Sequence, residues 1–143
     1  MITVAAATRI ALAALVVAAA GGCGGDERTF TAPEFVAEAN RNGAPLELGA
    51  PLTVAGDDEV YGVAVMERGA GDRETAEEAG EHGGGSLRIT EDAASAQDEH
   101  ARCESAASLI CYRAANVVLI LEPGVPARDL ARVAAAIRAM EAK

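Results

Sequence analysis

The sequence contains no tryptophan and only two phenylalanines and two tyrosines, so bulky aromatic side chains supply little of any core. It also lacks an apolar run of the roughly 20 residues that a membrane-spanning helix needs. Hydrophobic residues nevertheless make up 50% of the chain, and they are mainly aliphatic, because aromatic residues account for only 3%. We therefore expect one modest core of alanine, valine, leucine and isoleucine, with closely packed backbones.

Basic residues are also scarce, and this scarcity excludes one class of partner. The chain has 12 lysines and arginines against 22 aspartates and glutamates, a formal net charge of −10. The basic residues are scattered singly and form no stripe. A surface of this charge repels phosphate backbones, so we expect no binding of nucleic acid.

The N-terminus has the organisation of an export signal. Met1 to Arg9 carry a positive charge, and residues 10–20 form an apolar run without a charge. That run is too short to span a bilayer but has the length of the hydrophobic part of a signal peptide. It is followed directly by Ala20-Gly21-Gly22-Cys23, a run of small residues that ends in a cysteine.

This segment resembles the lipobox of bacterial lipoproteins, a family that prefers leucine where this chain has Ala20. The resemblance implies that residues 1–22 are removed after Gly22 and that Cys23 carries the lipid, with fatty acyl chains such as palmitate. It implies a protein anchored to the cell membrane on its extracytoplasmic side. From composition and length we expect residues 23–29 to form a flexible tether and 30–143 a single domain. An ordinary secretory signal, cleaved after an alanine, is the alternative.

The cysteine count agrees with this interpretation. Three cysteines in an exported protein leave one unpaired. If Cys23 is lipidated, Cys103 and Cys111 remain as a pair in a compartment where disulfides persist. The alternative is two buried free thiols that pack as small hydrophobic groups.

The first predicted helix has strong boundary signals. Thr31 and Glu34 have the spacing of a capping box, with Phe30 and Phe35 at the positions of a hydrophobic staple. The helix is expected to run to about Arg41, where Asn42-Gly43 provides a left-handed stop.

The rest of the chain predicts an α+β domain. The sequence predicts an extended stretch at 46–52, strands at 60–66 and 86–90, and a helix at 91–104. These are followed by a hairpin (109–113 and 117–121, with the turn at 114–116) and by a final helix that Pro126 and Asp129 open. We expect an antiparallel sheet of about four strands with helices packed on one face. Residues 67–85 read as a mobile acidic and glycine-rich loop.

The helix at 91–104 has two distinct faces. Ala93, Ala96, His100, Cys103 and Ala107 share one face and are predicted to point at the sheet. Asp92, Ser95, Asp98, Glu99 and Arg102 are predicted to lie on the opposite, solvated face.

The pattern from Ser86 to Met140 resembles domains of many small, uncharacterised bacterial lipoproteins. Their shared features are a strand, an alanine-rich helix, a hairpin with an asparagine turn and a closing amphipathic helix. This likeness is architectural and implies no active site.

Each motif with a candidate chemistry lacks a part that this chemistry needs. His82-Gly83-Gly84-Gly85 has the letters of an esterase oxyanion loop, but no G-x-S-x-G nucleophile motif accompanies it. His100, Cys103 and Glu104 lie within one helical turn but are fewer than the four ligands of a closed zinc site. Residues 72–81 lack the pattern of an EF-hand, and no phosphate-binding glycine loop occurs. We expect no metal, no cofactor and no catalytic residue.

The resulting hypothesis is a lipid-tethered, non-enzymatic binding or interaction module of the cell envelope. Its partners are the membrane, through the lipid on Cys23, and an envelope protein or ligand. The alternative is a small hydrolase or thiol enzyme that uses His100 or His82.

Overall fold

The computed structural model describes residues 28–52, 54, 56, 58–66 and 84–143. Its elements, in chain order, are α1 (Ala32–Arg41), β1 (Leu46–Leu52), β2 (Glu59–Val65), β3 (Gly85–Ile89), α3 (Ala93–Ser105), β4 (Ile110–Ala114), β5 (Val117–Leu121) and α4 (Ala127–Glu141). The expected signal peptide, Gly22, Cys23, His82 and residues 67–83 of the expected loop lie outside the described residues. Within the described part, no helix is both long enough and apolar enough to cross a bilayer.

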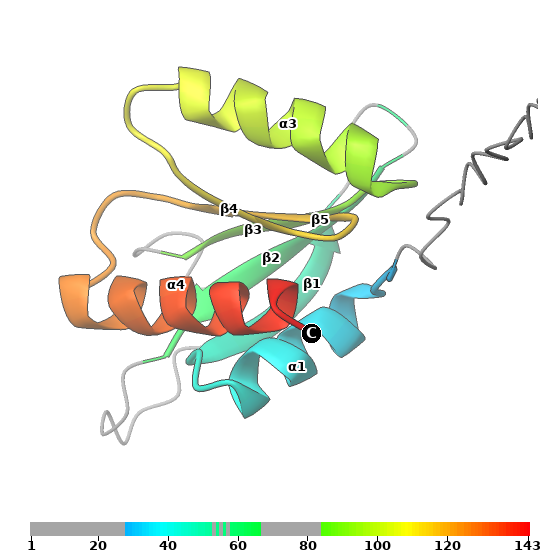
Figure 1. The fold of residues 1–143 in the computed structure, drawn as a ribbon. Coiled ribbons are helices and arrows are strands. Elements are labelled where there is room, and N and C mark those ends of the chain that lie inside the picture. Colours follow the sequence, from blue (N-terminus) through cyan, green and yellow to red (C-terminus); the bar gives the residue numbers. More distant parts are fainter. Residues whose placement is uncertain (1–27, 53, 55, 57, 67–83) are drawn as a thin grey trace, which may run out of the picture.

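The fold is α+β, as predicted. The strands form one antiparallel sheet in the order β1-β2-β3-β5-β4. The sheet has five strands where about four were expected, because Leu46–Leu52 is a true edge strand that pairs with β2. The two free edges of the sheet are therefore β1 and β4 (Figure 1).

The main core lies between the sheet and the pair of helices α1 and α4 (Figure 1). Phe35 of α1 and Val133 of α4 are fully buried against Leu87 and Leu119 in the middle of the sheet. Aliphatic residues dominate this core, in agreement with the composition. At about 25 cal/mol per Å² of apolar surface removed from water, such burial is the main source of stability for the domain.

Helix α3 packs on the other face of the sheet, whereas the sequence predicted all helices on one face. Figure 1 shows α3 on the side of the sheet opposite α1 and α4. Ala96 and Cys103 of α3 and Val118 of β5 are buried there, outside the main core cluster. Because successive residues of a strand point to opposite faces, an apolar strand such as β5 needs cover on both sides.

The start of α1 follows the predicted chemistry. The Glu34 carboxylate accepts a hydrogen bond of 2.9 Å from the main-chain N–H of Thr31, and the capping box is complete. This main-chain hydrogen bond holds the pKa of the Glu34 carboxyl below its usual value. The Phe30 and Phe35 rings meet edge to face with centroids 6.0 Å apart, which is the expected staple.

The hairpin turn anchors the start of the domain. Its Asn116 is 4% exposed. The side-chain oxygen accepts a hydrogen bond from the Phe30 N–H at 2.7 Å, and the side-chain nitrogen donates to the carbonyl oxygens of Phe30 and Thr90, each at 3.1 Å. One carboxamide thus joins the N-terminal segment, the end of β3 and the β4–β5 turn.

Candidate functional site

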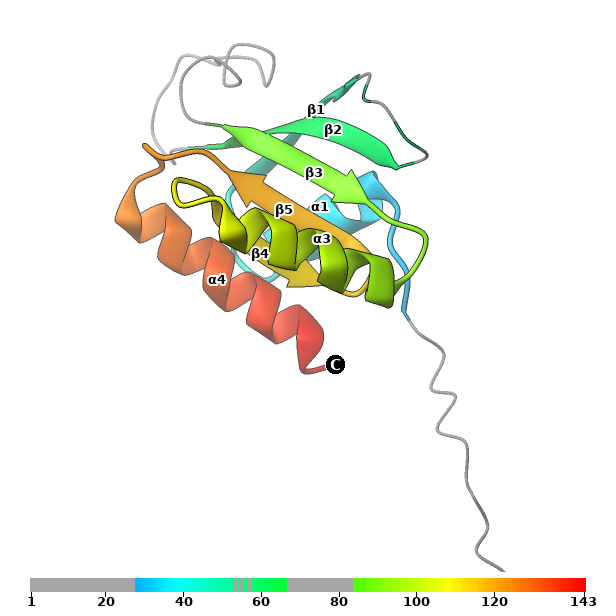
Figure 2. The same cartoon turned by 90° about the horizontal axis from the view of Figure 1, so that it is seen from above.

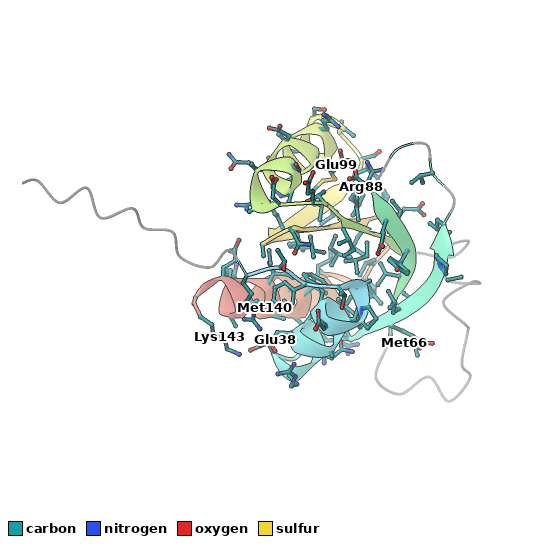
Figure 3. The ribbon with its side chains drawn as sticks, turned by 90° about the vertical axis from the view of Figure 1, so that its right-hand side faces the viewer. Glu38, Met66, Arg88, Glu99, Met140 and Lys143 are labelled. Atoms are coloured by element: carbon teal, nitrogen blue, oxygen red, sulfur yellow. A yellow bond between two sulfur atoms is a disulfide. The ribbon has the colours of Figure 1, made fainter. Side chains whose placement is uncertain are left out.

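The buried face of α3 includes one charged residue that the sequence predicted on the solvated face. Glu99, predicted to be solvated, is buried beneath α3 and lies 2.8 Å from the Arg88 guanidinium of β3 (Figure 3). Arg102 contacts the other oxygen of the same carboxylate at 3.0 Å. Ala107, predicted on the buried face, lies beyond the end of the helix and is exposed. Helical spacing alone did not reveal Glu99, because its partner Arg88 comes from a strand.

Cys103 and Cys111 join α3 to β4. The structure brings them to disulfide-bonding distance, with their Cα atoms 6.1 Å apart. The bridge thereby fixes the last turn of α3 over the edge strand. A thiol held in a disulfide is not a zinc ligand, and the described residues contain no group of three or more histidine, cysteine, aspartate or glutamate side chains that could hold a metal ion.

A groove runs beside this bridge, between α3 and α4. It has a volume of about 510 Å³, and its floor is formed by Cys111, Tyr112 and Arg113 of β4. We call it the edge groove, because the strand at its floor is a free edge of the sheet. Figure 2 shows α3 lying over β4 and α4 running along the outer side of this strand.

The two walls of the edge groove differ in chemistry. The α3 wall carries Gln97, His100, Ala101 and Glu104, which are polar, acidic or small. The α4 wall carries Ala134 and Ile137, with Arg138 and Glu141 farther along the helix. An occupant therefore meets a polar surface on one side and, on the other, an apolar surface that ends in two charged side chains.

The floor presents main-chain groups that the sheet does not use. The hairpin turn consists of residues 115–116, so Ala114 and Val117 pair directly across it. Pairs that flank a two-residue turn exchange main-chain hydrogen bonds, and bonded and non-bonded pairs alternate along an antiparallel ladder. The N–H and C=O groups of Cys111 and Arg113 consequently point away from β5, toward the groove.

His100 confirms the direction of one of these groups. Its Nε2 atom lies 3.3 Å from the carbonyl oxygen of Cys111, so this carbonyl faces α3 and the open edge. The other ring nitrogen, Nδ1, lies 3.6 Å from the Glu104 carboxylate, one turn along the helix. The imidazole thus takes a position at the edge where a neighbouring strand would otherwise place an N–H.

Tyr112 and two arginines complete the groove. The Tyr112 hydroxyl lies 3.4 Å from the carbonyl oxygen of Leu130, and burial raises the pKa of its phenol, an effect that Arg138 partly opposes. Within the described part of the chain, neither Arg113 nor Arg138 has a carboxylate within ion-pair distance. The groove thus contains two guanidinium groups beside the carboxylates of Glu104 and Glu141 in its walls.

A second hollow, of about 660 Å³, is larger but is a weaker candidate. It lies near the starts of α1 and α3 and carries the carboxylates of Asp58, Glu59 and Glu91. The described residues show no arrangement of these carboxylates that would hold a metal ion. Acidic side chains on an acidic protein are most simply solvated, so we take the edge groove as the candidate site.

Of the residues singled out from the sequence, the structure brings three together at the groove: His100, Glu104 and Cys111. Cys103 forms the disulfide with Cys111 but does not line the groove. Gly85, the last residue of the candidate oxyanion loop, begins β3 and has no space for a side chain, because a Cβ there would overlap the carbonyl oxygen of Ile120. Sequence reasoning missed Arg113 and the open main chain of β4, because the hairpin signal locates the two strands but not which of them lies at the edge of the sheet.

The fold and the groove define a class, namely a small α+β domain with an open sheet edge between two helices. Comparison with known proteins adds no family to this description, since no family model, no curated protein and no solved structure matches the chain.

Proposed function

We propose that this chain is a lipid-anchored protein of the extracytoplasmic membrane surface and that its domain is a non-enzymatic binding module. The observation that carries the binding role is the edge groove, in which unused main-chain groups of β4 lie open between two helices. Grooves with a few convergent polar groups are the usual form of binding sites. The anchorage rests on the lipobox-like run that ends at Cys23.

The cysteine arrangement supports the export part of this proposal. Cys103 and Cys111 are within bonding distance of each other, which leaves Cys23 without a partner among the three cysteines. Disulfides persist in exported proteins and are rare in the cytosol. Two acyl chains on Cys23 would give stable membrane attachment, where a single chain is marginal.

Metabolic labelling with a fatty-acid analogue tests the anchorage. The wild-type protein should incorporate the label, and Cys23→Ala should not. Cys103→Ser serves as the matched control, since it also removes a cysteine and should still be labelled. Labelling that survives in Cys23→Ala would refute the assigned lipid site.

Site-specific photo-crosslinking in the native envelope tests the binding role. A crosslinker at Ala101, an exposed residue in the wall of the edge groove, should capture a discrete partner. The control is Ala135, which is equally a helical, exposed alanine but does not line the groove. Equal capture from both positions, or capture from neither, would contradict a binding role for the groove.

A small hydrolase or thiol enzyme that uses His100 or His82 is the second candidate. One observation favours it, namely that His100 lies in the groove with the Glu104 carboxylate 3.6 Å from its ring. This enzyme would lose its activity in His100→Ala while its melting temperature changes little. In a binding module, His100→Ala exposes the Cys111 carbonyl to solvent and costs about 0.5–1.5 kcal/mol of stability, as for one hydrogen bond.

A further inference from the structure

We infer that the edge groove receives an extended segment of a partner polypeptide, which adds a sixth strand to the sheet beside β4. This inference rests on the proposed binding role of the groove and specifies the chemistry of its occupant. Main-chain hydrogen bonds would supply affinity, and the two walls would select alternate side chains, as in other cases of strand addition.

The first argument is the hydrogen-bonding capacity of the floor. Cys111 and Arg113 each present one N–H and one C=O to the groove, in the spacing that one neighbouring strand satisfies. Such a row of main-chain groups, none of which has a partner in the sheet, matches a polypeptide backbone better than it matches a compact ligand. Strands rise about 3.3 Å per residue, so a segment of roughly five residues covers β4.

The second argument is the contrast between the two edges of the sheet. β1, the opposite edge, contains Pro51 and an irregular register between Leu48 and Pro51, both of which hinder the addition of another strand. β4 contains no proline and pairs with β5 in continuous register. The edge that lies in the groove is thus the one without these protective features.

The third argument is the position of His100. Its ring nitrogen contacts the Cys111 carbonyl at the place where the N–H of an added strand would donate. His100 therefore satisfies this acceptor in the free protein, and an incoming strand would replace it.

The walls define the side chains that the segment carries. Because side chains alternate along a strand, every second one would face Ala134 and Ile137 on α4, and the others would face Gln97 and His100 on α3. The segment should therefore alternate apolar and polar residues. Because two glutamates (Glu104 and Glu141) line the groove together with two arginines (Arg113 and Arg138), the walls favour neither sign of charge among the polar residues.

The test uses the full chain, purified in detergent, and a displayed library of random ten-residue peptides as the probe. Recovered peptides should alternate apolar and polar residues. In nuclear magnetic resonance spectra, a bound peptide should slow the hydrogen exchange of the Cys111 and Arg113 amides and show cross-strand contacts with β4.

Two substitutions of Arg113 distinguish the contribution of its main-chain N–H to peptide binding from the contribution of its side chain. Arg113→Pro removes an N–H that the β4–β5 ladder does not use, a change that edge strands tolerate, and should weaken binding of a recovered peptide at least tenfold. Arg113→Ala keeps the N–H and should weaken binding only a few-fold. Thermal melting checks that both variants fold, and Ala101→Trp, which fills the groove from an exposed helical position, is the substitute if Arg113→Pro does not.

Several results would overturn strand addition. They are the recovery of no peptide, peptide binding that Arg113→Pro and Ala101→Trp leave unchanged, spectral changes confined to other parts of the domain, and occupation of the β4 edge by a second copy of the chain. If the crosslinker at Ala101 still captures an envelope partner in such a case, the binding role survives and only the strand-addition mode fails. If both experiments fail, the proposed binding role of the groove fails as well.

Discussion

At the scale of single residues, buried polar groups join segments of this domain that are far apart in the sequence. Asn116 bonds to main-chain groups of two other segments, and Glu38 of α1 lies among cations from both ends of the described chain (Figure 3). Buried polar atoms that lose their partners cost more than the original bond contributed. Residues of this kind are therefore the most sensitive to substitution.

Asn116→Ala should strongly destabilise the domain. The change leaves the Phe30 N–H and the carbonyl oxygens of Phe30 and Thr90 without their side-chain partner. We expect a loss of about 3 kcal/mol in the free energy of unfolding, measured by chemical denaturation. Ala115→Gly, in the same turn, is the control, because Ala115 has a φ of 51° that glycine adopts more readily. Equal effects of the two changes would contradict the role assigned to the carboxamide.

Glu38 should contribute to a loss of stability in acid. The hydrogen bond from Lys143 is the largest effect that lowers the pKa of this carboxyl below its usual 4.5, and the charge of Arg41 adds to it. The folded state therefore binds the proton less readily than the unfolded state, so the contribution is complete above pH 4.5 and is lost as the pH falls below that value.

The measurement is the free energy of unfolding between pH 7 and pH 3. In Glu38→Gln, the free energy of unfolding should fall less steeply as the pH decreases. The decrease that remains should come from groups such as Asp92 and Glu34, whose pKa values are also lowered. Glu122→Gln, on an exposed carboxylate after β5, should leave the decline as in the wild type. An identical decline in all three proteins would rule out the Glu38 contribution.

At the scale of elements, α3 and β4 act as one unit because the Cys103–Cys111 bridge joins them at the groove. In the chain-entropy model, closing so short a loop stabilises the fold by about 2.5 kcal/mol. Cys111→Ser should lower the free energy of unfolding by about this amount, and Cys23→Ala should not change it. Titration of the unfolded, unreduced protein should find no free thiol at position 103 or 111, and two reactive thiols there would disprove the bridge.

The elements themselves were largely predictable from the sequence. The capping box at Thr31, the apolar run of β5 and the hairpin turn placed their elements within one or two residues of the observed bounds. These signals are local, because caps and turns are built from neighbouring residues. The position of α3 was not predicted, although β5, apolar at every position, already carried a signal for burial on both faces.

The candidate site was harder to predict than the elements. Cys111 and His100 stood out in the sequence, but the groove that unites them depends on which strand ends up at the edge of the sheet. Strand order arises from long-range pairing, which no local pattern specifies. Glu99 was misplaced for the same reason, since its partner Arg88 lies on β3. Residues that acquire their role through distant contacts need the fold to reveal them.

At the scale of the whole molecule, the proposed lipid anchor, the proposed export and the proposed binding role are consistent with one another. A net charge of −10 disfavours contact with anionic headgroups, so membrane attachment would depend on the lipid rather than on the surface of the domain. Tethering would concentrate the edge groove near other envelope proteins, where even a weak strand-addition contact gains from high local concentration. Export would also provide the oxidising surroundings in which the α3–β4 bridge persists.

The most direct test of this view is the mass of the N-terminal peptide of protein isolated from cell membranes. We predict that the mature chain begins at Cys23 and that this residue carries the added mass of a diacylglyceryl group. An unmodified thiol at position 23, or a chain that retains residues 1–22, would contradict the proposed anchorage and the compartment assigned to the domain.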